Sequence, residues 1–172
     1  MRVAIVRETF EGEGRVAASP SAVRALVAAG HEVRVEQAAG AASGFSDDEY
    51  IRAGAHIAPT AEEAFDFGAL VWKVLRPSAH EARLLRADQV VAACMHHGPP
   101  PAFAVLALES ARAPSGATPV LAAMSEIAGR LAVDAATVAL AAPSGGRGIL
   151  LGGVPGVAPA RVVVLGDRKS VV

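Results

Sequence analysis

The chain is poor in the residues that stabilise small secreted proteins or bind nucleic acid. Cys94 is the only cysteine among 172 residues, so an internal disulfide is excluded and a reducing compartment is the default. Cys94 lies in an apolar run, which favours a buried small hydrophobe over a reactive thiol. The formal net charge of −1 offers no basic surface for nucleic acid. Aromatic residues make up 4% of the chain and apolar residues 52%, which predicts a core of small and β-branched side chains.

Long apolar runs are also absent. No stretch approaches the roughly 18 consecutive apolar residues that a membrane span requires. The N-terminus is charged at Arg2, Arg7 and Glu8 and lacks the apolar segment of a signal peptide. Three histidines are scattered without metal-ligand spacing: His31, His56 and His80. These absences predict a cytoplasmic protein with no membrane span, no metal and no nucleic-acid partner.

What is present is an alternation of strands and helices. Apolar or alternating runs predict strands at 3–6, 31–36, 69–75, 89–95, 103–109 and 161–166. Capping residues and apolar stripes predict helices from Ser19 to Gly30, from Ser46 to about Gly54, within 78–87 and over 124–142. Such an alternation is typical of an α/β fold with a Rossmann-like, flavodoxin-like, doubly wound parallel sheet.

One junction does not fit this pattern. Only "HHGPPPA" lies between the strand that ends at Met95 and the strand that starts near Phe103. Parallel neighbours need a crossover of at least about 10–12 residues, and three consecutive prolines cannot form a helix interior. Either these two strands are not parallel neighbours, or a crossover helix has been lost.

Four motifs in order carry a resemblance to a known family. They are "GRVAASP" (14–20), the block from "LVAAG" to "GAHI" (26–57), "MSEIAGRLAV" (124–133) and "GGRGILLGGVPGVAPARVVVLG" (145–166). Together they resemble the alanine dehydrogenases and the α subunits of the NAD(P) transhydrogenases. The last two motifs are closer to alanine dehydrogenase. The resemblance covers nearly all of 1–166, with no counterpart at 97–102.

The resemblance implies two Rossmann-like domains with an active site in the cleft between them. Residues 1–123 would form the N-terminal substrate domain, and 124–160 an inter-domain helix and glycine-rich connection. Residues 161–166 would be the first strand of a missing NAD-binding domain. Residues 167–172 look like a translated sequencing-library adapter, so we exclude them from the fold as a non-native tail. The implied cofactor is NAD, the implied substrates are L-alanine and pyruvate, and the implied assembly is a homo-hexamer.

Two residues at predicted strand ends are candidates for chemistry. Arg15 lies in a glycine-flanked loop beyond the first strand, where α/β sheets bind ligands and a guanidinium can hold a carboxylate. His96 directly follows the strand that ends at Met95, and an imidazole suits proton transfer near neutral pH. The alternatives from the residues alone are a solvated arginine and a structural histidine. The resemblance implies that Arg15 anchors the substrate carboxylate and that His96 is the catalytic histidine.

Position 75 departs from the family. Alanine dehydrogenases have a lysine there, in a K-V-K-E-P pattern that contacts the substrate's carbonyl region, whereas this chain has Leu75. Lys73 keeps the first lysine of the pattern and is our candidate for substrate binding. Regular alternation predicts that it shares a face with Leu75, about 6–7 Å away along the strand. The transhydrogenase subunits also lack the lysine at 75.

Ser125 matches a serine that contacts the nicotinamide cofactor in the family, although a helix N-cap would be a sufficient structural reason for it. The leading hypothesis is the N-terminal piece of an NAD-dependent alanine dehydrogenase that is inactive as a fragment. The alternatives are a piece of a transhydrogenase α subunit, favoured by Leu75, and a divergent chain without activity.

Overall fold

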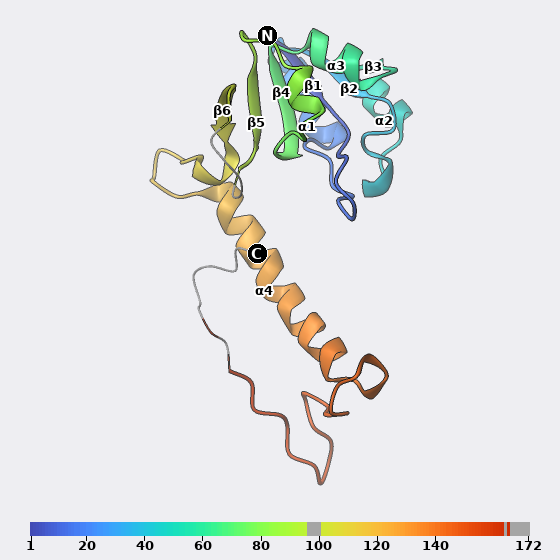
Figure 1. Cartoon of the computed structure of the whole chain (residues 1–172), viewed down its shortest axis with the longest axis vertical. Coiled ribbons are helices and arrows are strands. Elements are labelled where there is room, and N and C mark those ends of the chain that lie inside the picture. Colours follow the sequence, from blue (N-terminus) through green and yellow to red (C-terminus); the bar gives the residue numbers. More distant parts are fainter. Residues whose placement is uncertain (96–100, 164, 166–172) are drawn as a thin grey trace. The chain divides into compact units, whose positions relative to one another are not determined.

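The computed structural model describes residues 1–95, 101–163 and 165 (Figure 1). The chain divides into two compact units, Met1–Ala111 and Arg112–Val172. The first unit contains the sheet, and the second contains the longest helix.

The first unit is built on a six-stranded sheet in which every pair of neighbours is parallel. The strands are β1 (Arg2–Ile5), β2 (Glu32–Glu36), β3 (His56–Ala58), β4 (Leu70–Leu75), β5 (Val90–Cys94) and β6 (Ala104–Ala107). Their order in the sheet is β3-β2-β1-β4-β5-β6. The predicted Rossmann-like parallel sheet is therefore confirmed.

Helices cover both faces of this sheet. The connecting elements are α1 (Pro20–Ala28), α2 (Asp47–Arg52), α3 (Ala61–Phe67) and the short 3₁₀ turns η1 (Ala41–Ser43), η2 (Glu81–Arg83) and η3 (Leu108–Ser110). Val3 and Ile5 of β1 pack with Val23 of α1 on one face. Ala4 of the same strand packs with Phe65 of α3 on the other. Successive residues of β1 thus enter two separate cores, as a doubly wound sheet requires.

Two helix starts are as the sequence predicts. Ser19 caps α1 through its side chain, which accepts from the Ala22 N–H, and Pro20 occupies the first turn. Ser46 and Glu49 form a reciprocal capping box at the start of α2.

Other expectations need correction. Neither β3 nor α3 was predicted from the sequence, and the helix expected within 78–87 is only the single turn η2. Cys94 is partly rather than fully buried. The strands β5 and β6 are parallel neighbours joined by the nine residues 95–103, so the first explanation of the short junction is wrong.

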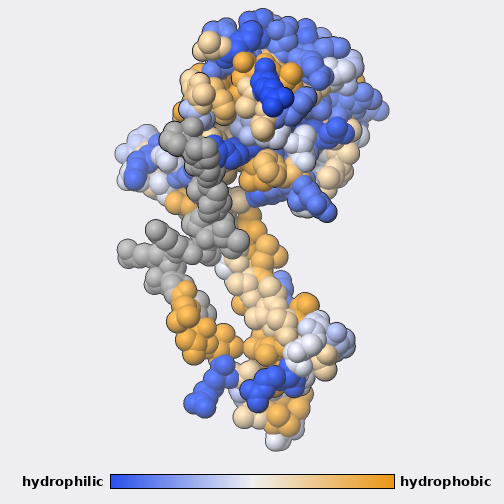
Figure 2. All heavy atoms as spheres, viewed as in Figure 1, coloured by the Kyte–Doolittle hydropathy of each residue, from blue (hydrophilic) through white to orange (hydrophobic). Residues whose placement is uncertain are grey.

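The second unit contains α4 (Pro119–Leu140) and the turn η4 (Ala142–Ser144). The helix starts five residues before the predicted Met124, because Thr118 and Pro119 occupy its N-terminus. Its exposed surface is largely apolar (Figure 2), with Ile127, Leu131 and Val138 each more than half exposed. In the part of the chain that the structure describes, no helix combines the length and apolar character needed to cross a membrane. Residues 161–163 pair with no described strand, so their assignment to a further domain stays a prediction.

Candidate active site

The sheet reverses its winding between β1 and β4. From β1 the chain adds β2 and β3 on one side, and it then returns to add β4, β5 and β6 on the other. Ligands of open α/β sheets bind at the carboxyl ends of the strands beside such a switch point. Here those ends carry the loop 6–19 after β1 and the end of β4 at Leu75.

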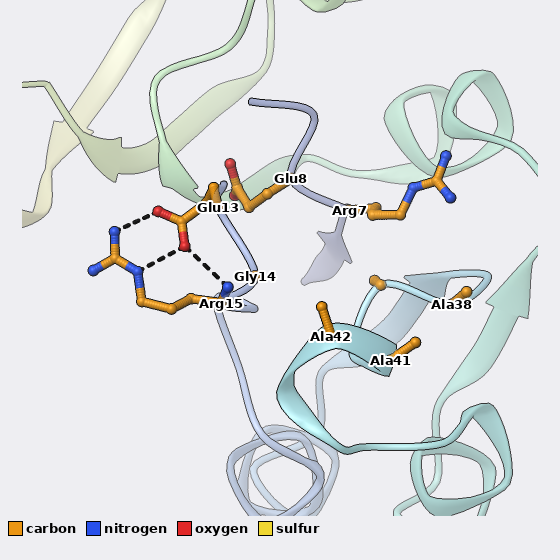
Figure 3. A pocket seen from close by; sticks show the side chains of 9 residues that line it. Arg7, Glu8, Glu13, Gly14, Arg15, Ala38, Ala41 and Ala42 are labelled. Carbon is orange, nitrogen blue, oxygen red and sulfur yellow. Dashed lines mark hydrogen bonds and ion pairs between the residues drawn. The ribbon is translucent and has the colours of Figure 1, made fainter. Parts of the chain in front are cut away.

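A cavity of about 240 Å³ lies beside the loop that follows β1 (Figure 3). Its lining is Arg7, Glu8, Glu13, Gly14, Arg15, Ala38, Ala39, Ala41 and Ala42. One wall is charged and comes from the β1 loop, and the other is made of alanines that follow β2. The cavity therefore offers both ionic and small apolar contacts to a small molecule.

Arg15 is held in place by a carboxylate of its own loop. Its Nε donates to Glu13 Oε1 at 2.8 Å and its Nη2 to Glu13 Oε2 at 2.5 Å. Glu13 Oε1 also accepts the Arg15 backbone N–H at 2.9 Å. The hydrogen bond from Arg15 lowers the pKa of Glu13, and the same bond raises the pKa of Arg15. Since the Arg15 side chain is about half exposed, its fork is oriented but still reachable from solvent.

The alanine wall depends on a tight turn after β2. Ala38 has a positive φ of 59°, and its N–H donates to Asp47 Oδ1 at 2.9 Å. Ser43 donates from its hydroxyl to the Gly14 carbonyl at 2.7 Å, which ties this turn to the loop that carries Arg15. Buried Tyr50 donates to the Ala18 carbonyl at 2.8 Å and fixes the far end of the same loop. These hydrogen bonds thus hold the charged wall and the alanine wall of the cavity in a fixed position relative to each other.

Behind the charged wall lies a buried cluster of three ionisable side chains, Glu8, Lys73 and Glu81, which we call the Glu8 cluster. The Lys73 ammonium lies 2.8 Å from Glu81 Oε1 and 3.5 Å from Glu8 Oε2, and it donates to the Arg7 carbonyl at 3.3 Å. The three side chains are 2%, 0% and 5% exposed, in the order named. Lys73 is therefore committed to acceptors within the protein.

The Glu8 cluster also interrupts β4. The ladder between β4 and β5 shifts between Trp72 and Leu75, where β4 has one more residue than β5. At this bulge the Val74 N–H donates to Glu8 Oε1 at 2.7 Å. Side chains do not alternate regularly between the two faces of a sheet across a bulge. The prediction that Lys73 and Leu75 share a face therefore no longer follows from their spacing.

The four predicted site residues have different outcomes. Arg15 and Lys73 lie in the first unit at the switch point, with Arg15 at the cavity and Lys73 buried behind it. His96 lies outside the described residues. Ser125 is the seventh residue of α4 rather than its N-cap, and it belongs to the second unit. The substrate and cofactor roles of all four stay predictions.

Three acidic residues of the site, Glu8, Glu13 and Glu81, were missed by the sequence analysis. Glu8 and Glu13 belong to the charged stretch "RETFEGEGR" directly after the first strand, which was a usable signal. Glu81 had none, because its role depends on a lysine eight residues earlier. The described residues contain no group of three or more His, Cys, Asp or Glu side chains suited to a metal ion.

Comparison with known families gives matches along nearly the whole chain. The model of the "Alanine dehydrogenase/PNT, N-terminal domain" matches residues 4–128, and that of the corresponding C-terminal domain matches residues 132–167. Curated relatives include alanine dehydrogenases of Methanococcus maripaludis, 38% identical, and Halomonas elongata, 41% identical. Each alignment covers 96% of this chain and 47% of the relative. The chain thus spans about half the length of these relatives.

Solved structures agree with the sequence matches. An L-alanine dehydrogenase superposes with a TM-score of 0.82 and 38% identity over 92% of this chain and 46% of that chain. A transhydrogenase from Sinorhizobium meliloti gives a TM-score of 0.53 and 41% identity over 55% of this chain and 28% of that chain.

The alignments are longer than the part of this chain that they cover. The alignment with the Halomonas elongata relative is 175 positions long, but 96% of 172 residues is only about 165. About ten aligned positions therefore have no residue of this chain. The alignment length does not place these positions along the chain, so the second explanation of the junction, a lost crossover helix, stays a prediction.

Proposed function

The chain belongs to the alanine dehydrogenase/PNT family, and on this premise we propose that it is the N-terminal piece of an NAD-dependent alanine dehydrogenase. The parent protein would convert L-alanine, NAD and water to pyruvate, ammonia and NADH. The observation that carries this proposal is the oriented Arg15 fork at a small cavity on the switch point of the sheet.

In this proposal Arg15 holds the substrate carboxylate. Glu13 engages the edge of the guanidinium formed by Nε and Nη2. In this proposal the substrate carboxylate binds across Nη1 and Nη2, which match its two oxygens in spacing. Because Glu13 fixes the side-chain torsions of Arg15, less conformational entropy is lost when the carboxylate binds. The alanines of the opposite wall would accommodate a short aliphatic side chain such as a methyl group.

His96 would move the proton. As the resemblance implies, its imidazole would take and return a proton at the substrate nitrogen or oxygen while the C–N bond is broken or made. NAD supplies hydride acceptance when it is bound. Among the described residues Ser125 could contribute a hydroxyl to it, but the glycine-rich stretch 145–156 does not have the fingerprint of a dinucleotide-binding turn. We therefore expect the 172-residue chain by itself to form no NADH from L-alanine.

A second candidate is the corresponding piece of a transhydrogenase α subunit. Leu75 in place of the family lysine favours it, and such a protein would pass hydride between nicotinamide nucleotides without an amino-acid substrate. The two are separated by assaying the parent protein with L-alanine and NAD, and in parallel with NADPH and an NAD analogue. L-alanine-dependent NADH formation supports the dehydrogenase. Hydride transfer between nucleotides without L-alanine oxidation would favour the transhydrogenase subunit. If neither activity is detected, the result supports a divergent, inactive chain.

Leu75 provides a gain-of-function prediction. L75K in the parent protein is expected to raise kcat/KM for L-alanine by about 10–100-fold, because one charge-assisted hydrogen bond contributes about 1.5–3 kcal/mol. Leu75 is only partly buried, so a lysine there has access to solvent. The matched control is L75M, which adds length without charge and is expected to change kcat/KM less than threefold. Equal values for L75K and the wild type would show that this position does not reach the substrate.

The remaining properties follow the same proposal. A single partly buried cysteine fits a protein of the reducing cytoplasm. A homo-hexamer is the assembly that the resemblance implies, and sedimentation of the parent protein tests it.

A further inference from the structure

The Glu8 cluster has one more acidic group than basic groups. If Glu8 and Glu81 are both ionised, Lys73 neutralises only one of them, and one negative charge stays uncompensated among side chains that are at most 5% exposed. Burying an uncompensated charge is costly, and proteins commonly avoid it by taking up a proton.

The two carboxylates are not equivalent. Glu81 uses both oxygens: Oε1 accepts from Lys73 at 2.8 Å, and Oε2 accepts from the Ser78 N–H at 2.8 Å. Glu8 uses only Oε1, since its buried Oε2 has no hydrogen-bond partner among the described residues and lies 3.5 Å from the ammonium. Protonation of Glu8 at Oε2 therefore breaks no hydrogen bond to a described residue, whereas protonation of Glu81 would disrupt one of its two hydrogen bonds.

The electrostatic environment points the same way. Burial raises the pKa of Glu8, and the opposing effects of Lys73 and of the Val74 and Leu75 N–H groups do not cancel this rise. Burial also acts to raise the pKa of Glu81. There, however, the hydrogen bonds from Lys73 and Ser78 outweigh it, so the pKa falls below its ordinary value.

Glu8 faces the binding cavity as well as the cluster. It lines the cavity together with Arg15 and Glu13. The titratable and charged groups around it are Lys73 of β4, Glu81 of η2, Cys94 of β5, and Arg7, Glu13 and Arg15 of its own loop. With Glu8 neutral, Glu13 is the one carboxylate of the cavity lining that opposes an incoming anion. With Glu8 ionised there are two.

We propose that Glu8 holds a proton in this cluster and that this proton permits Arg15 to bind a carboxylate substrate. Loss of the proton weakens carboxylate binding, which makes Glu8 a pH-sensitive positioning residue of the site. The binding half of this inference rests on the proposed function of Arg15. The protonation of Glu8 rests on the cluster alone.

The two carboxylates should affect stability with opposite signs. A Glu8 pKa raised above its unfolded value of about 4.5 means that the folded state holds a proton that the unfolded state has lost. Its stabilising contribution is then present below that value and disappears as the pH rises through the folded pKa. A lowered Glu81 pKa contributes stability above about 4.5, which is lost as the pH falls.

The first test compares thermal unfolding of the 172-residue chain with that of E8Q and E81Q between pH 5 and 9. The Tm of E8Q is expected to rise relative to the wild type as the pH increases, because glutamine mimics the protonated side chain. E81Q is expected to lower the Tm at every pH in this range, because Glu81 is ionised throughout it. An E8Q chain that loses as much Tm as E81Q at pH 7, or fails to fold, would overturn the inference.

Infrared spectroscopy supplies a readout that does not depend on stability. At pH 7 the wild-type chain is expected to show a protonated-carboxyl C=O band that E8Q lacks, because Lys73 and Glu81 then form a one-to-one ion pair. A wild-type spectrum without this band would also overturn the inference.

The second test measures binding of oxamate, a non-reacting analogue of pyruvate, to the wild-type chain and E8Q from pH 6 to pH 9. The wild-type Kd is expected to rise about tenfold or more over this range, while that of E8Q stays constant within a factor of about two. Oxamate binding that is independent of pH in the wild type contradicts the inference. Absence of oxamate binding at every pH contradicts the proposed role of Arg15, and with it the binding half of the inference, while the Tm and infrared results still decide the protonation of Glu8.

Discussion

Lys73→Met is expected to cost the chain about 3–5 kcal/mol of unfolding free energy, because it leaves the Glu81 carboxylate buried without a counter-charge beside a neutral Glu8. A domain of this size is stable by only about 5–15 kcal/mol, so the variant should be close to unfolding at room temperature. Denaturant unfolding at pH 7 measures the loss. The loss should shrink as the pH falls below about 4.5, where Glu81 takes up a proton.

Two controls make this result specific to the Glu8 cluster. R83M changes an exposed arginine of η2 and is expected to alter stability by less than about 0.5 kcal/mol. E81Q combined with K73M removes the stranded carboxylate and should recover part of the loss. If K73M unfolds at the wild-type denaturant concentration, the ammonium is not needed in the core and the substrate role predicted for Lys73 becomes the better explanation.

Arg15→Met is expected to lower kcat/KM of the parent protein for L-alanine by about 100–10,000-fold. Two charge-assisted hydrogen bonds to the substrate would be lost, at about 1.5–3 kcal/mol each, and Glu13 would be left as a carboxylate that repels the substrate. The fold should be little affected, because the side chain is about half exposed. Steady-state kinetics and the Tm of the same preparation measure the two effects.

Matched arginine variants control this experiment. R15K keeps the charge without the fork and is expected to fall between R15M and the wild type. R24M alters an exposed arginine of α1 away from the cavity lining and is expected to leave kcat/KM unchanged within a factor of about two. An R15M protein with wild-type kcat/KM would remove Arg15 from the site.

The sequence predicts most of the sheet because its strands are short apolar runs, and because capping residues mark the helices between them. Ser19–Pro20 and Ser46 mark the starts of α1 and α2 directly. β3 is only three residues long, and α3 carries charges at Glu62, Glu63 and Asp66 that leave a weak apolar stripe. Tertiary packing forms these two elements, with Phe65 fully buried against the sheet, so local patterns do not reveal them.

The candidate site was only partly predictable for a related reason. Arg15 and its loop follow from the position of the first strand. The contact between Glu8 and Lys73 joins residues 65 positions apart in the sequence, and it exists because β1 and β4 are neighbours in the sheet. The face occupied by Lys73 could not be read from alternation, because the bulge adds a residue between Trp72 and Leu75. Such an insertion has no pattern of its own in a single sequence.

The central claim is that Arg15 anchors the carboxylate of a small keto or amino acid at the switch point of the sheet. A crystal structure of the parent protein with pyruvate tests it most directly. We predict the pyruvate carboxylate on the Nη1 and Nη2 edge of Arg15, with Glu13 still on the Nε side and Lys73 still buried with Glu81. Pyruvate bound elsewhere, or on a Lys73 that has left the Glu8 cluster, would contradict the account.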